Sequence, residues 1–153
     1  MSIIQDLYNI YDKELARYRA QTSSKNRLLV EMQHNLAFLH EGLREGLPQG
    51  AVIGALEDAQ YRAACDQGID LATLRKSPLS RATCGGIREF NRYLGWDSAR
   101  LISKVYERIA TLKKLAAGSD SIDLRARLSN LFKLLMVVLA HLEARQLLIV
   151  QNP

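Results

Sequence analysis

Apolar residues recur at every third or fourth position along most of this chain, the spacing that places side chains on one face of an α-helix. The most apolar segment spans residues 131–150, and within it residues 134–140 include no polar side chain. A helix that is apolar on all sides is normally surrounded by other helices. The pattern therefore predicts an all-α fold with a central hydrophobic C-terminal helix.

Turn and capping residues divide the rest of the pattern into helices joined by short loops. Residues 46–50 combine two glycines with a proline, Asp97 is a favourable N-cap, and Gly118 follows another apolar stripe. The expected helices cover residues 2–20, 25–45, 51–67, 71–76, 79–94, 97–117 and 121–148. Since the sequence has no repeat or low-complexity linker, we expect a single domain over 1–153. Without the short segment 71–76, and with or without residues 79–94, these ranges make a compact bundle of five or six helices.

Residues 79–94 fit a helix least well. Apolar residues share one helical face there, but each glycine of the Gly85-Gly86 pair costs a helix roughly 1 kcal/mol relative to alanine. Either the glycines permit a close backbone contact, or the helix begins only at Gly86. In the second case the amides at the helix start offer an anion-binding turn as a further alternative.

The chain carries 21 Lys and Arg against 16 Asp and Glu, for a net charge of +5. A positive charge favours contact with nucleic acid or anionic surfaces. The basic residues are scattered, however, with only short clusters at 75–76, 113–114 and 125–127. Scattered charge is typical of solvated helix faces. Nucleic-acid binding by these basic faces is therefore an alternative function and not the leading one.

Cysteine and targeting patterns indicate the compartment. Cys65 and Cys84 belong to no CxxC or Cys–His motif, and two unpaired cysteines suit a reducing compartment. The N-terminal residues lack the basic and apolar regions of a signal peptide. Residues 131–150 are long enough to span a membrane but include Lys133 and Glu143, so we interpret them as a core helix. We expect a cytoplasmic protein without a membrane span.

The residue types that carry most enzyme chemistry are not grouped in this sequence. His34 and His40 are six positions apart and His141 is distant, whereas ligands on one helix are best spaced by three or four. Glu41 and Glu45 lie one turn apart without a neighbour that would make one an acid and the other a base. We therefore expect no metal and no cofactor, and these residues favour a non-catalytic protein over an enzyme.

Apolar side chains at positions expected to be exposed favour an interaction domain. Leu147, Leu148, Ile149 and Val150 form an apolar run, and Phe38 falls on the outward face of its helix. Exposed apolar patches usually bind a partner, although a neighbouring helix is an equal explanation for Phe38. The leading hypothesis is a non-catalytic interaction or oligomerisation domain, or a small adaptor subunit. It would bind a protein partner or a second copy of itself as a homodimer.

Arg27 and His34 are separated by six residues, which places both on one face of a helix two turns apart. This spacing resembles the RxxxxxxH motif of the HEPN family of helical ribonucleases. The resemblance covers these eight residues and the helical architecture, and Leu28 departs from the polar residue usual after the arginine. It implies a second alternative function, RNA cleavage, usually across a dimer. His34 would transfer a proton and Arg27 would hold the scissile phosphate.

Overall fold

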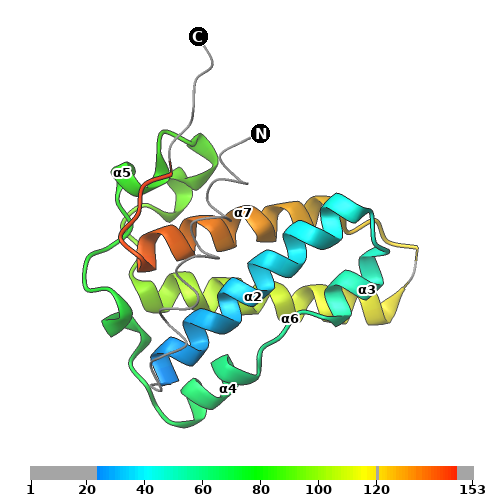
Figure 1. Ribbon diagram of the computed structural model, residues 1–153, viewed down its shortest axis with the longest axis horizontal. Coiled ribbons are helices and arrows are strands. Elements are labelled where there is room, and N and C mark those ends of the chain that lie inside the picture. Colours follow the sequence, from blue (N-terminus) through cyan, green and yellow to red (C-terminus); the bar gives the residue numbers. More distant parts are fainter. Residues whose placement is uncertain (1–23, 120, 148–153) are drawn as a thin grey trace.

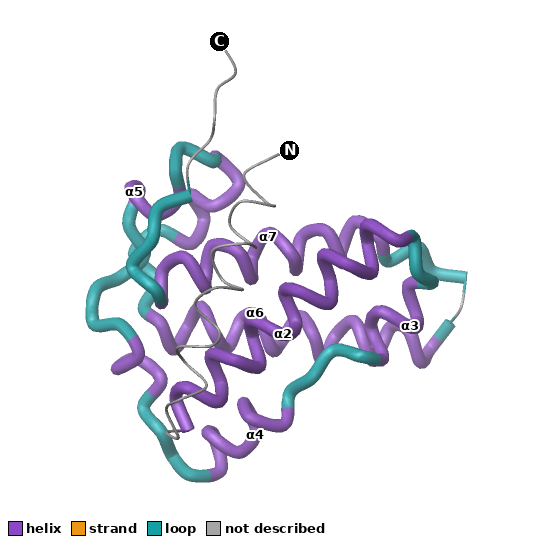
Figure 2. Tube along the Cα trace, in the orientation of Figure 1, coloured by secondary structure: helices purple, strands orange, loops and turns teal. Residues whose placement is uncertain are grey.

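The computed structural model describes residues 24–119 and 121–147, and these residues form helices and loops with no strand among them (Figures 1 and 2). Three long helices provide the framework: α2 (Ser24–Glu45), α6 (Ser98–Gly118) and α7 (Arg125–Leu142). Both α2 and α6 pack against α7. The predicted all-α bundle is confirmed, and the helix expected over residues 2–20 lies outside the described residues.

Within the described ranges, five short helical segments connect and cover these three helices. They are α3 (Gln49–Gly54), α4 (Ala59–Asp66), the 3-10 helix η1 (Leu71–Leu74), α5 (Arg81–Cys84) and the 3-10 helix η2 (Arg88–Tyr93). α3 contacts α2 and α6, α4 packs on α2, and η1 packs on α6. α5 lies against α7, so that the segment before α6 covers one end of the bundle (Figure 1).

α7 lies at the centre of the core, as its composition predicts. Every residue from 134 to 140 is at most 4% exposed, which includes residues on all sides of the helix. Buried side chains of α2 and α6, such as Met32 and Val105, belong to the same core. The prediction of a central hydrophobic C-terminal helix is therefore confirmed.

α6 follows its capping signals. Its N-cap is Asp97, whose Oδ1 accepts a hydrogen bond from Arg100 N at 2.8 Å, and the helix ends at Gly118. A capping carboxylate of this kind satisfies an amide that has no partner inside the helix. Among the helices of residues 24–119 and 121–147, none is long and apolar enough to cross a membrane.

α7 starts later than predicted. It begins at Arg125 and not after a cap at residues 120–121. The side chain of Gln49 in α3 binds the chain at this point, because its Oε1 accepts a hydrogen bond from Leu124 N at 2.8 Å. This contact joins positions 75 residues apart, so no local pattern in the sequence indicates it.

α7 also ends earlier than predicted, at Leu142 and not near residue 148. Ala144 has a left-handed φ of 55°, and Arg145 N donates a hydrogen bond to Ala140 O at 2.8 Å. This is the Schellman geometry that ends a helix, and it usually employs glycine. Since alanine occupies the position, the sequence carries no signal for the stop.

The prediction of one continuous helix over residues 51–67 is wrong, because this segment forms two helices, α3 and α4, with a break between them. The side chain of Asn35 in α2 makes two hydrogen bonds to the backbone of Glu57 at this break. Its Nδ2 donates to Glu57 O at 2.8 Å and its Oδ1 accepts from Glu57 N at 2.9 Å. Asn35 is 2% exposed. A buried side chain therefore replaces the backbone hydrogen bonds that a continuous helix would have made.

The continuous helix expected over residues 79–94 is also wrong. α5 ends at Cys84, and the residue that follows it, Gly85, has a left-handed φ of 62°. A Cβ atom at Gly85 would lie 1.6 Å from the carbonyl oxygen of Leu147, and Leu147 N donates a hydrogen bond to Thr83 O at 3.0 Å. Of the alternatives, the close backbone contact is the one found, between α5 and the segment that follows α7.

Candidate functional site

Only two of the apolar residues that were predicted to contact a partner, Phe38 and Leu147, belong to the part of the chain that the structure describes. Leu147 is 1% exposed because it packs against α5 in the same chain, so its expected role on the surface is wrong. Phe38 is partly buried and packs against the core, in agreement with the neighbour-packing explanation. Leu148, Ile149 and Val150 lie outside the described residues.

Arg27 and His34 do lie on one helix, α2, and both are exposed. Neither residue lines any of the three cavities that are described below.

His141 is fully buried and forms a polar cluster with Ser98 and Arg75. The Ser98 hydroxyl donates to Arg75 O at 3.0 Å, so it accepts from His141 Nε2 at 3.2 Å. The Nδ1 atom of His141 faces the guanidinium of Arg75 at 3.5 Å and is thus an acceptor. Burial, with the charge of Arg75, lowers the pKa of His141 to about 4. Since the serine proton is used by the backbone, this cluster is a structural link and not a nucleophile.

The lowered pKa of His141 should make the stability of the fold depend on pH. Its pKa is lower in the folded protein than its ordinary value of 6.5, so the unfolded chain takes up the proton first as the pH falls. The free energy of unfolding should therefore decrease between pH 6.5 and pH 4, by an amount on the order of 3 kcal/mol. Urea unfolding at several pH values measures this. In the His141→Gln variant the decrease should be smaller, and an unchanged decrease would assign the effect to other groups.

A groove of about 370 Å³ lies at the surface between α6 and α7. Its walls carry cationic and polar side chains from both helices. The lining residues are Lys104, Glu107, Arg108, Thr111, Leu112, Arg127 and Asn130. The walls carry three cations, Lys104, Arg108 and Arg127, against one carboxylate, Glu107. The groove is therefore positively charged, like the protein as a whole.

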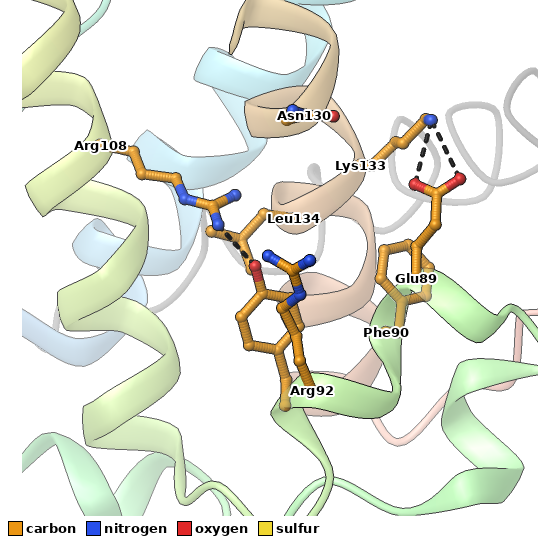
Figure 3. Close-up of a pocket in the computed structure, with 8 residues that line it drawn as sticks. Glu89, Phe90, Arg92, Arg108, Asn130, Lys133 and Leu134 are labelled. Carbon is orange, nitrogen blue, oxygen red and sulfur yellow. Dashed lines mark hydrogen bonds and ion pairs between the residues drawn. The ribbon is translucent and has the colours of Figure 1, made fainter.

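A smaller cavity of about 100 Å³ adjoins this groove where η2 meets α6 and α7 (Figure 3). Its lining residues are Glu89, Phe90, Arg92, Tyr93, Arg108, Asn130, Lys133 and Leu134. Arg108 and Asn130 belong to the walls of both cavities, so the two lie side by side. We call the combined surface the α6–α7 groove and its smaller part the η2 cavity.

Both carboxylates of the α6–α7 groove are paired with lysines. Lys133 Nζ lies 3.1 Å from Glu89 Oε2, and Lys104 Nζ lies 3.3 Å from Glu107 Oε1. The arginines in the walls are Arg92, Arg108 and Arg127, and the described residues offer none of them a carboxylate within 4 Å. The positive charge of the groove is therefore carried by three guanidinium groups.

Tyr93 lies beside two of these arginines and hydrogen-bonds to one of them. Its ring is buried and packs edge-on against Trp96, with the ring centroids 5.0 Å apart. The guanidinium carbons of Arg92 and Arg108 lie 5.9 and 5.8 Å from the Tyr93 ring centroid, and Arg108 Nη2 donates to Tyr93 Oη at 2.6 Å. An arginine that is held by an aromatic ring loses less freedom when it binds an anion.

The α6–α7 groove has the chemistry of an anion site. Guanidinium groups match phosphate and carboxylate oxygens in pairs, while Thr111 and Asn130 add neutral donors. Across the described ranges, no three His, Cys, Asp or Glu side chains gather as a metal site would require. Comparison with models of protein families, with curated proteins and with solved structures gave no match for this chain.

Proposed function

We propose that this protein binds nucleic acid by contacting the phosphate backbone in the α6–α7 groove. The observation that supports the proposal most is the convergence of Arg92, Arg108 and Arg127 on one groove without a described carboxylate partner. Phosphate contacts by such side chains supply most of the affinity of non-specific nucleic-acid binding. They position the ligand and carry little sequence information.

The shape of the groove also supports a chain-like ligand. Its two parts extend along α6 and α7, from Arg127 and Leu112 in the larger part to Arg92 at η2. A polyanion lying in it would meet successive guanidinium groups, whereas a small molecule would meet one or two of them. We therefore favour a single strand over a compact metabolite as the ligand.

A protein partner is the second candidate function. The described large apolar side chains that remain exposed are Leu43, Leu47 and Ile122, at 39%, 45% and 39%. Leu43 and Leu47 line a hollow of about 340 Å³ near the end of α2. Isolated exposed apolar residues are common in monomers, so this surface is weaker support than the groove. Light scattering separates the candidates, because self-association needs no nucleic acid.

The proposal predicts salt-dependent binding that depends on particular arginines. Fluorescence anisotropy with a 20-nucleotide single strand of RNA or DNA should give an association constant that falls as salt rises. Replacing two exposed groove residues, Arg92→Gln and Arg127→Gln together, should weaken binding. The slope of log K against log salt should become shallower by about 1.4, from about 0.7 for each lost phosphate contact.

A matched control removes two positive charges elsewhere. Arg81 and Lys114 are exposed and line neither part of the groove, so the Arg81→Gln, Lys114→Gln double variant should keep the wild-type slope. Binding that is absent, or that weakens equally in the two double variants, would contradict the proposal. In the second case the net charge and not the groove would attract the strand.

A further inference from the structure

We infer that the η2 cavity holds the terminal phosphate of a nucleic-acid strand, an inference that rests on the proposed function of the α6–α7 groove. The terminal phosphate is a phosphomonoester at the 5′ or the 3′ end. The other phosphates of the strand are diesters and would lie along the larger part of the groove.

The size and position of the η2 cavity point to a chain end. The cavity is about 100 Å³, against about 370 Å³ for the adjoining part of the groove. Its walls include the buried rings of Phe90 and Tyr93, and Figure 3 shows the η2 segment, which carries Phe90 and Arg92, below α7. A single phosphate group fits the smaller volume, and the larger part of the groove has the room for the diester-linked nucleotides that follow it.

The charge of the cavity favours the monoester as well. A terminal phosphate carries about −1.5 to −2 at neutral pH, against −1 for a diester. Arg92 and Arg108 come from η2 and α6 and both direct their guanidinium groups into the cavity (Figure 3). Tyr93 keeps both arginines near one ring despite their like charge. A dianion between them would neutralise both, and each guanidinium can bind two oxygens of one phosphate.

The acidic residue of the cavity does not oppose this assignment. Lys133 Nζ binds both carboxylate oxygens of Glu89, at 3.3 and 3.1 Å. Figure 3 shows this pair on the side of the cavity away from Arg108. The charge of Glu89 is therefore compensated locally, and the guanidinium groups of Arg92 and Arg108 remain for an anion.

Three forms of one oligonucleotide test the inference. They share a sequence and an internal fluorophore and carry a 5′-phosphate, a 3′-phosphate or hydroxyl groups at both ends. We expect one phosphorylated form to bind about tenfold or more tightly than the hydroxyl form, because charge-assisted hydrogen bonds to a second anionic charge are among the stronger polar contacts. The two phosphorylated forms identify which end is bound.

Two variants locate the preference in the η2 cavity. Arg92→Gln and Arg108→Gln should each reduce the preference to about twofold or less. Arg92 is exposed and its replacement should leave the fold intact, so it decides the result if Arg108→Gln fails to fold. The control is Arg100→Gln, since Arg100 also lies over an aromatic ring, 3.7 Å from the centroid of Trp96, but lines neither part of the groove.

The outcomes separate the inference from the proposed function. Equal, salt-dependent binding of all three oligonucleotides would overturn the terminal-phosphate site and leave the groove proposal standing. A preference that survives in both arginine variants would also overturn the site. If no oligonucleotide binds, the proposed function and the inference both fall.

Discussion

Replacing Val138 with aspartate should unfold this protein. Val138 lies in α7, is fully buried, and has apolar neighbours on the same helix at positions 134–140. An aspartate there would place an unpaired carboxylate in the core, or would have to take up a proton to avoid doing so. We expect a loss of at least about 4 kcal/mol, out of a total stability of about 5–15 kcal/mol for a typical domain.

Circular dichroism and urea unfolding measure this loss. The control is Ala126→Asp, because Ala126 is exposed on the same helix and the substitution introduces the same charge. The control should retain the wild-type helix signal and denaturation midpoint within the usual range for a surface substitution, about 0.5 kcal/mol. A Val138→Asp protein as stable as this control would mean that α7 is not the centre of the core.

Replacing Glu31 with alanine should cause the second largest loss of folding stability, after Val138→Asp. The Glu31 carboxylate is 3% exposed and accepts three hydrogen bonds, from Gln60 N at 2.7 Å, Tyr61 N at 3.3 Å and Tyr106 Oη at 2.8 Å. Two of these donors are amides at the start of α4, where helical amides have no partner inside the helix. Burial and the charge of Glu31 raise the pKa of Tyr106, so its hydroxyl remains a donor at neutral pH.

Alanine at position 31 would leave these three donors without an acceptor, at a cost of about 3 kcal/mol in total. Chemical denaturation should also show that Glu31→Gln is milder, because the amide oxygen still accepts hydrogen bonds. On the same helix, Glu41 forms an exposed ion pair with Arg44, and Glu41→Ala should cost less than about 1 kcal/mol. Equal losses for the alanine variants at positions 31 and 41 would contradict the role of Glu31.

The long helices were predictable because their signals are local. The apolar run at 134–140 predicts a central helix, and Asp97 and Gly118 mark the two ends of α6. These features depend on residues within a few turns of one another. The fold class and the long helices follow from them.

The breaks between helices were missed because distant residues cause them. Asn35 interrupts the segment 51–67 by binding Glu57, and Leu147 approaches Gly85 across the end of the bundle. Such contacts form only after the helices have packed. For the same reason the apolar residue Leu147 was interpreted as exposed when it is buried.

The groove was missed for a related reason. Its arginines, Arg92, Arg108 and Arg127, lie on three different elements and far apart along the chain. Along the chain they belong to the scattered basic charge that is typical of solvated helix faces. Packing of α6 against α7, with η2 beside them, brings the three together.

The location of bound nucleic acid tests the central claim most directly. Backbone amide chemical shifts of the 15N-labelled protein should be recorded during titration with a single-stranded oligonucleotide. The changes should concentrate in η2, in residues 104–112 of α6 and in residues 127–134 of α7. Changes concentrated instead around Arg27 and His34 in α2, or no changes at low salt, would contradict binding in the α6–α7 groove.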